Sequence, residues 1–152
     1  MPSHAKASSS QLRALDAFIK LQRAANSASS TLQKHLDTYD LTTSQFGALE
    51  ALYHRGPMCL SDLGRKLLRS GGNMTLVSSN LEKRGLVRRD RSKEDRRVLH
   101  MMLTAKGQRL IEAVWPKHLE LLVQSMSVLD PAEQAELARL CKKLGIGQQP
   151  AG

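Results

Sequence analysis

The segment Leu68–Val87, LRSGGNMTLVSSNLEKRGLV, contains residue types that can contact either a phosphate or a nucleic-acid base. Two adjacent glycines, Gly71 and Gly72, precede a helical pattern, and glycines ahead of a helix N-terminus can cradle a phosphate. A nucleotide-binding loop needs a strand before its glycines and a Lys-Ser or Lys-Thr after them, whereas here a helix comes first and neither pair follows. We therefore interpret the glycines as residues that let two helices turn sharply.

The helix that follows the glycines has an unusual polar face. On a helical wheel, Met74, Val77, Ser78 and Leu81 share one face, which we expect to pack inward. A solvated helix usually carries Glu and Lys on its other face, whereas this one carries mainly uncharged groups that can hydrogen-bond to base edges. An ordinary surface helix is the alternative. The candidate DNA-contacting residues on this face are Asn73, Thr75, Leu76, Ser79 and Asn80.

Positive charge is concentrated directly after this helix. Residues 82–97 hold eight Lys or Arg against four Asp or Glu, so this segment carries +4 of the formal net charge of +9. A basic balance indicates a polyanionic partner, either nucleic acid or an anionic membrane surface. A solvated charged face is the alternative for any such run.

The remaining reactive residue types form no recognisable catalytic or metal-binding pattern. Cys59 and Cys141 are far apart, and no CxxC occurs, which favours a reduced, cytoplasmic chain with Cys141 in the core of the last helix. The histidines, at 4, 35, 54, 100 and 118, show no HxxxH or HExxH spacing. We therefore expect no enzymatic activity, no metal site and no cofactor.

The ends and the apolar segments of the chain show no targeting or membrane signal. The first ten residues lack the apolar run of a signal peptide, and no stretch of 18 apolar residues occurs. We therefore expect no membrane partner.

The elements that must position the polar helix and the basic segment are mainly helical. Apolar periodicity predicts helices over residues 10–38, from a Thr42–Gln45 capping box to HRGP, over CLSDLGRKLL, over residues 73–84 and from Thr104 onward. Pro116 is expected to bend or split the helix that contains it. Asp130 and Pro131 mark the start of a last helix that Gly145 ends.

The period changes to two after the polar helix. GLVRRD and RVLHMMLT predict two strands, joined by the polar loop RSKEDR. A short helix, a tight turn, a polar helix and a basic hairpin, in that order, are the layout of a winged helix-turn-helix with a two-stranded β-wing. In that layout the second helix enters the major groove and the hairpin reaches the adjacent minor groove.

The segment LSDLGRKLL…GGNMTLVSSNLEKRGLVRRDRSKEDRRVLHMMLTAKG resembles the MarR family of bacterial transcriptional regulators. LEKRGLV, then DRR, then LTAKG carry the resemblance, which extends over about residues 10–145. It implies a homodimer in which the long terminal helices, residues 10–38 and 104–145, form the dimerisation body and residues 39–103 form the DNA-binding winged helix-turn-helix. The tails, 1–9 and 146–152, are expected to be flexible.

The apolar residues of the long helices agree with a dimer. The stripe of the first helix, together with Leu110, Ile111, Val114, Leu121 and Leu122, exceeds what one small winged-helix unit can cover. Packing within the chain alone is the alternative.

The resemblance also implies roles for the wing residues. The family's wing motif corresponds to Asp95, Arg96 and Arg97, where Arg97 would enter the minor groove and Asp95 would orient it. Phosphate contacts are expected from Arg88, Arg89, Arg91 and Lys93, although some of these are expected to be ordinary solvated charges. Many family members carry Arg at the position of Leu76, so the operator preference of this chain is left open.

The function that the resemblance implies is sequence-specific regulation of transcription through double-stranded DNA. The simplest mechanism is a homodimeric repressor of a pseudo-palindromic operator that a small aromatic or phenolic acid releases. No residue identifies such an effector or its site. The alternatives are a redox-responsive regulator that uses Cys59, at the start of a helix, and a non-specific architectural nucleic-acid binder.

Overall fold

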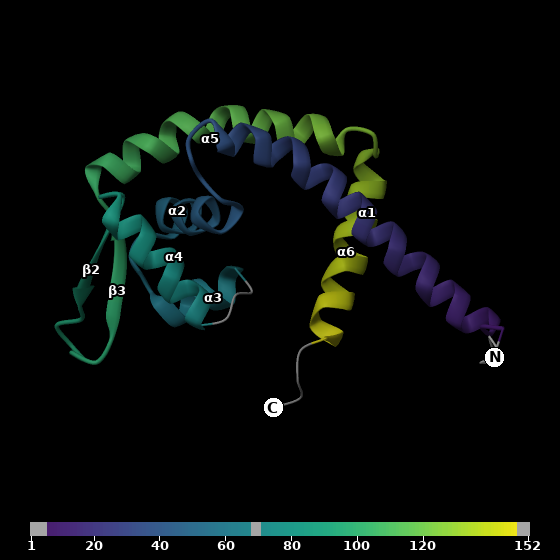
Figure 1. Cartoon of the computed structure of the whole chain (residues 1–152), viewed down its shortest axis with the longest axis horizontal. Coiled ribbons are helices and arrows are strands. Elements are labelled where there is room, and N and C mark those ends of the chain that lie inside the picture. Colours follow the sequence, from purple (N-terminus) through teal and green to yellow (C-terminus); the bar gives the residue numbers. More distant parts are fainter. Residues whose placement is uncertain (1–5, 68–70, 149–152) are drawn as a thin grey trace, which may run out of the picture. The chain divides into compact units, whose positions relative to one another are not determined.

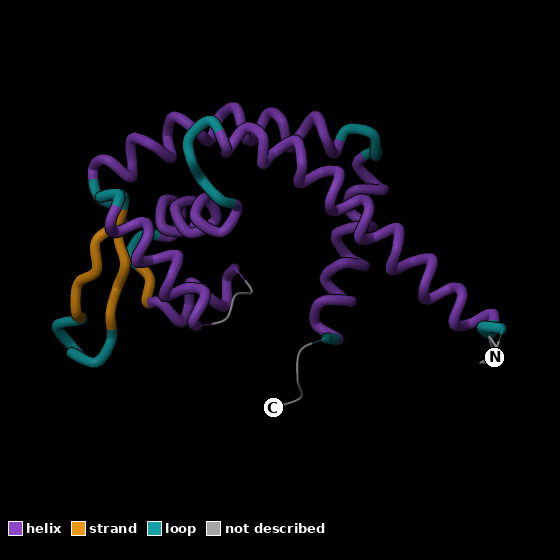
Figure 2. Tube along the Cα trace, viewed as in Figure 1, coloured by secondary structure: helices purple, strands orange, loops and turns teal. Residues whose placement is uncertain are grey.

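The protein is mainly helical with one small antiparallel sheet, as seen in a computed structural model that describes residues 6–67 and 71–148 (Figure 1). The predicted order of helices and hairpin is confirmed (Figure 2). The expected RSGG turn covers residues 69–72. Arg69 and Ser70 lie outside the described residues, whereas Gly71 and Gly72 are the first two residues of α4, so the expectation that these glycines precede the helix is wrong. The outer parts of the predicted tails also lie outside the described residues. The elements are α1 (Ser9–Asp37), α2 (Thr43–Arg55), β1 (Met58–Cys59), α3 (Leu60–Leu67), α4 (Gly71–Lys83), β2 (Val87–Arg91), β3 (Leu99–Leu103), α5 (Ala105–Met126) and α6 (Pro131–Gly147).

The chain forms two compact units, and two helices run through both of them. The central unit is Leu32–Leu119, and the terminal unit consists of the described parts of Met1–Thr31 and Glu120–Gly152. The helices α1 and α5 each contribute residues to the two units. The functional assignment of residues 10–38 and 104–145 to dimerisation stays a prediction.

The hydrophobic core lies in the central unit. The last turn of α1 contributes Leu36, α2 contributes Leu49, and α5 contributes Ile111, all at most 1% exposed. The polar helix α4 contributes Met74 and Leu81, both 0% exposed. Burial of these aliphatic side chains is the main force that holds the helices against the sheet.

The sheet has three strands in the order β1-β3-β2, which corrects the prediction of two. The wing is the hairpin of β2 and β3, with Val87 opposite Leu103 and Arg91 opposite Leu99. The added strand β1 pairs its two residues, Met58 and Cys59, with the other edge of β3. A strand of two residues shows no alternation in the sequence, so the period of two could not reveal it.

The helix starts that the sequence predicted from capping residues are confirmed. Thr42 and Gln45 form a reciprocal capping box at α2, and Asp130 and Glu133 form another at α6. Pro116 lies inside one continuous α5, so of the two expected effects, a bend or a split, the split does not occur. The end of α6 differs from expectation, because the helix continues past Gly145 to Gly147.

The LTAKG motif joins the end of α4 to the start of α5. The Thr104 hydroxyl donates to the Gly85 carbonyl (2.6 Å) and accepts from the Gly107 N–H (3.1 Å). A Cβ added to Gly107 would lie 2.0 Å from the Leu86 carbonyl oxygen, so the backbones approach too closely for any side chain. This contact fixes where the hairpin leaves the helix.

Large apolar side chains remain exposed in the terminal unit. Phe18 on α1 is 57% exposed, Val128 is 86% exposed, and Leu144 on α6 is 49% exposed. The expected core position of Cys141 is wrong, because this thiol is exposed in the isolated chain. Among the described residues, no helix is long and apolar enough to cross a bilayer.

Candidate nucleic-acid interface

The polar helix α4 presents two chemically distinct faces, as its sequence predicted. Met74, Val77 and Ser78 are buried, and the Ser78 hydroxyl donates to the Thr75 carbonyl (3.0 Å), which satisfies this buried polar group. Thus the inward face holds no unpaired hydroxyl that would weaken the packing.

The outward face of α4 carries the predicted DNA-contacting residues at different degrees of exposure. Asn73 and Thr75 are exposed, and Leu76 is 62% exposed, whereas Ser79 and Asn80 are half-buried. No charged side chain stands among these five. Their contact with DNA stays a prediction, and Leu76 brings an apolar surface that could meet a thymine methyl.

Asp95 and Arg97 are joined within the wing loop, between β2 and β3. The Asp95 carboxylate accepts from the Arg97 backbone N–H (3.0 Å), from Nε (3.1 Å) and from Nη2 (3.3 Å). Hydrogen bonds from the Arg97 side chain and then from its backbone lower the pKa of Asp95 below its ordinary value. The Arg97 side chain is still 91% exposed, so it is oriented by the carboxylate and accessible to a ligand.

Arg89 forms an ion pair that links the wing to α4. Its Nε donates to Glu82 Oε2 (3.0 Å) and its Nη2 donates to Oε1 (2.9 Å). This pair lowers the pKa of Glu82 and raises the pKa of Arg89 relative to their ordinary values. Since the Arg89 side chain is only 27% exposed, much of its charge is neutralised within the protein. Its predicted phosphate contact remains untested.

The other predicted wing cations lie on the surface. Arg88 approaches Asp90 at 3.7 Å, and Arg91 Nη1 donates to the Arg96 carbonyl (2.7 Å). Arg88, Arg91, Lys93 and Arg96 are all exposed. A set of accessible cations on one hairpin is suited to phosphate oxygens, because such contacts depend on charge more than on geometry.

Arg84 makes a connection that the sequence did not reveal. Its Nη1 donates to the Asp40 carbonyl (2.6 Å) and its Nη2 to the Tyr39 carbonyl (3.1 Å), in the turn between α1 and α2. Lys106 Nζ in turn donates to the Arg84 carbonyl (2.8 Å). The end of α4 is therefore tied to the ends of α1 and α5. In the sequence Arg84 is indistinguishable from its charged neighbours.

Cys59, the candidate redox residue, lies half-buried in β1. Its sulfur is 3.3 Å from the Ser61 hydroxyl oxygen, and it faces His100 across the sheet register. Hydrogen bonds from the Cys59 thiol and then from Arg65 lower the pKa of Asp62. A redox role for Cys59 stays a prediction. Within residues 6–67 and 71–148, no group of three or more His, Cys, Asp or Glu could hold a metal ion.

Residues 41–99, which lie in the central unit, match the family model described as "MarR family". This range includes α2, α3, α4 and the wing loop. The HTH-type transcriptional regulator MhqR of Bacillus subtilis is 34% identical over 134 residues, which span 88% of this chain and 92% of MhqR.

Solved structures of regulators have the same fold. BpsR of Bordetella bronchiseptica, whose DNA binding is regulated by 6-hydroxynicotinic acid, has a TM-score of 0.76 at 25% identity over 86% of this chain and 98% of BpsR. Reduced AbfR bound to DNA has a TM-score of 0.73 at 26% identity over 92% of this chain and 97% of AbfR. With a relative as similar as MhqR over nearly the whole of both chains, this protein belongs to the MarR family of transcriptional regulators.

Proposed function

We propose that this MarR family regulator is a homodimeric repressor that reads a pseudo-palindromic operator and is released by a small aromatic or phenolic acid. The observation that carries the proposal is the combination of an uncharged, exposed polar face on α4 with an adjoining hairpin that holds Arg97 out on Asp95. The DNA-bound structure of AbfR, a chain of the same fold, supports double-stranded DNA as the partner.

The two parts of the interface supply different kinds of contact. Uncharged Asn73 and Thr75 on α4 can approach base edges in the major groove without repulsion from the phosphates. The exposed Arg97 suits a narrow minor groove, whose negative potential attracts guanidinium groups. Specificity then comes mainly from α4, and affinity mainly from the wing.

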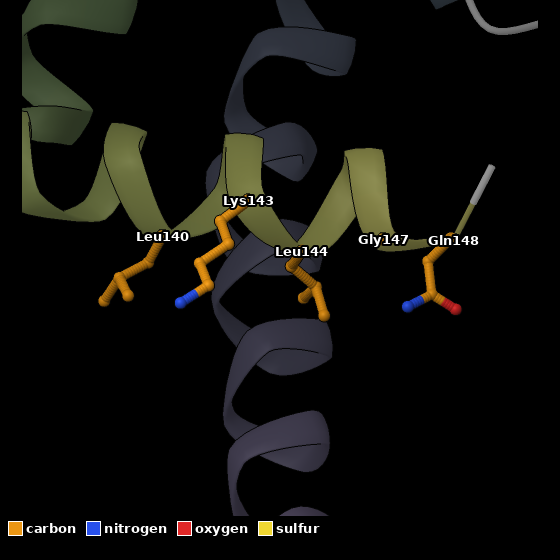
Figure 3. A pocket seen from close by; sticks show the side chains of 5 residues that line it. All are labelled: Leu140, Lys143, Leu144, Gly147 and Gln148. Atoms are coloured by element: carbon orange, nitrogen blue, oxygen red, sulfur yellow. The ribbon is translucent and has the colours of Figure 1, made fainter.

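The partner that we propose for the terminal unit is a second copy of this chain. Between α1 and α6 lies an apolar groove of about 600 Å³, and its lining includes Phe18, Leu137, Leu140 and Leu144. Figure 3 shows Leu140, Lys143 and Leu144 projecting from the same side of α6, and Gln148 directly after the helix points the same way; these residues line a further hollow. Contiguous exposed apolar side chains of this kind usually mark an interface, and the family resemblance implies a homodimer.

The effector class is supported by a relative in fold. 6-Hydroxynicotinic acid, which regulates the DNA binding of BpsR, is an aromatic acid with a ring hydroxyl. A compound of this class would release operator from our protein if it bound the free dimer more tightly than the DNA-bound dimer.

Selection of duplexes from a random pool tests the proposal. Full-length protein should enrich a pseudo-palindrome with half-sites about one helical turn apart, and it should bind that duplex at least about a thousandfold tighter than a scrambled duplex at matched salt. Adding 6-hydroxynicotinic acid or related hydroxylated aromatic acids should reduce recovery of the pseudo-palindrome.

Three outcomes would contradict parts of the proposal separately. Equal affinity for scrambled duplexes would indicate a non-specific architectural binder. A sedimentation mass of one chain at micromolar concentration would exclude the stable dimer. The redox alternative would be favoured if peroxide released the operator from the wild type but not from Cys59→Ser, and if aromatic acids had no effect on operator binding.

A further inference from the structure

Two histidines from distant parts of the chain meet inside the central unit. His118 on α5 is 8% exposed, and its ring centroid lies 6.0 Å from that of the half-buried His35 on α1. On its other side, the Phe46 ring of α2 lies 4.2 Å away. His35 Nε2 is 3.3 Å from the Val114 carbonyl oxygen, so the same imidazole also links α1 to α5. The histidine pair therefore lies where three helices pack together.

The environment of His118 accepts a neutral imidazole and not a cation. Its Nδ1 is buried and has no hydrogen-bond partner among the described residues. Burial, and then the nearby His35, lower the pKa of His118 below its ordinary value of 6.5. Burial disfavours the charged form of an imidazole, which is why the pKa falls.

Among the described residues, no ion pair joins His118 to a carboxylate, and the only charged group that acts on its pKa is His35. From α1, His35 and Tyr39 face the pair, and the rings of these two residues meet at 5.5 Å. From α2, the Glu50 carboxylate lies 3.7 Å from His54, with which it pairs. His54 in turn packs on Trp115 of α5, with centroids 4.9 Å apart. On α5 itself, Lys117 and Glu120 flank His118 and carry opposite charges.

A chain of contacts connects the histidine pair to the polar helix α4. His35 packs on Tyr39, whose carbonyl accepts from Arg84, and Arg84 lies at the end of α4. The adjacent Asp40 carbonyl accepts from the same guanidinium. Movement of His35 away from a protonated His118 would therefore disturb the turn that anchors α4. Coupling of this kind travels through packed side chains and hydrogen bonds with two discrete arrangements.

We propose that His35 and His118 form a proton-sensitive switch that loosens the packing of α1, α2 and α5 and lowers operator affinity when the protein is acidified from neutral pH. The inference rests on the proposed function for its DNA readout. Protonating both imidazoles would place two positive charges near each other and leave an N–H at His118 Nδ1 buried without an acceptor, so the helices would separate to hydrate them.

The sign of the stability effect follows from the lowered pKa. The unfolded chain takes up a proton near pH 6.5, whereas folded His118 does so only at lower pH. Between these two pH values the unfolded state binds more protons, so stability falls as the pH drops through this interval. General electrostatics has the opposite effect on DNA binding, because protonation of exposed histidines adds positive charge and tightens phosphate contacts.

The switch can be tested by two measurements on the whole chain, operator affinity and thermal unfolding. Both are made at pH 7.5 and at pH 5.5, at constant ionic strength. Using the duplex selected from the random pool, we expect the wild type to lose affinity about fivefold or more on acidification, the lower end of typical coupling between sites. His118→Phe should bind at pH 7.5 like the wild type and show no such loss. His54→Gln, which alters the neighbouring histidine, should respond like the wild type.

Two further measurements keep the test decisive. His35→Gln removes the repelling imidazole, so the midpoint of the acid response should move toward pH 6.5. Histidine NMR of the free protein should give a His118 pKa below the ordinary value of 6.5. If no operator is found at all, the proposed function fails, while NMR and unfolding still report on the switch.

Two results would overturn the inference. The first is an operator affinity that stays constant or rises on acidification. The second is an acid response that persists in His118→Phe or His118→Gln.

Discussion

At the scale of single residues, the wing arginine is held in place without losing its exposure. Asp95 accepts three hydrogen bonds from Arg97, and the arginine side chain is 91% exposed. Because the pKa of Asp95 is lowered, the carboxylate stays charged above its ordinary pKa, and the pair is lost only as the pH falls through the lowered value. An acid response of operator binding near pH 6 therefore cannot come from this pair.

Replacing Arg97 by alanine should weaken operator binding by about 1 kcal/mol or more, because an oriented guanidinium is removed from the DNA surface. Fluorescence anisotropy with the selected duplex measures this loss, and sedimentation should show an unchanged dimer. Arg139→Ala is the matched control, because it removes an arginine that pairs with Glu136 on α6. Equal affinities of the two variants would contradict the wing assignment.

At the scale of elements, α4 is braced on two sides. Arg89 of β2 binds Glu82 of α4, and Arg84, directly after α4, binds the α1–α2 turn. These bonds hold α4 against the wing and the α1–α2 turn, so we expect them to support the proposed DNA contacts of its polar face.

Replacing Glu82 by glutamine should reduce operator affinity by roughly two- to fivefold, since the brace to Arg89 is a partly exposed ion pair of modest strength. Electrostatics alone predicts the reverse, because the substitution removes a negative charge from the DNA-binding side. Titration of operator against Glu94→Gln, which removes an equal charge from the wing loop, separates these effects. Tighter binding by both variants would rule out a role for the brace.

Gly107→Ala should destabilise the fold by about 1–3 kcal/mol, the usual cost of overpacking. The added methyl group would lie 2.0 Å from the Leu86 carbonyl oxygen, so the hairpin or α5 must shift. Urea denaturation followed by circular dichroism measures the change. At Gly145, in α6, an added Cβ meets nothing within 4 Å, so Gly145→Ala should instead stabilise by about 0.5–1 kcal/mol. If both substitutions change the free energy of unfolding by the same amount, the close approach of Gly107 to the Leu86 carbonyl oxygen is contradicted.

At the scale of the whole molecule, charge and apolar surface are separated between the units. The central unit, Leu32–Leu119, holds sixteen Lys or Arg and nine Asp or Glu, which is +7 of the net +9. The terminal unit is nearly balanced in charge and exposes Phe18, Leu140 and Leu144. This distribution suits a protein that meets a polyanion with one unit and another apolar surface with the other.

Leu137→Glu should weaken the dimer by about tenfold or more, because a carboxylate would be buried without a partner in the groove between α1 and α6. Operator affinity should fall as the dimer weakens. In a dimer, binding of one α4 to its half-site raises the effective concentration of the other α4 at the second half-site, and separate monomers lack this advantage. Analytical ultracentrifugation checks the first effect and anisotropy the second. Ala138→Glu adds the same charge at an exposed neighbour that does not line this groove, and it should stay dimeric. If both variants sediment with the same mass, the proposal that this groove is the dimer interface is contradicted.

The sequence by itself determined the local features of this protein. Periodicity and capping residues located the helices, the two faces of α4 and the β2–β3 hairpin, because these depend on neighbours within a few residues. The composition of residues 82–97 identified the basic hairpin for the same reason.

Only the tertiary structure decided which charges and imidazoles have partners. Arg88 and Arg89 look alike in the sequence, yet one is exposed and the other is bound to Glu82. His35 and His118 are 83 positions apart, and nothing in their local patterns predicts that their rings meet. Burial and partnership depend on how α1, α2 and α5 pack, and that packing is set by the sum of many weak apolar contacts across the whole core.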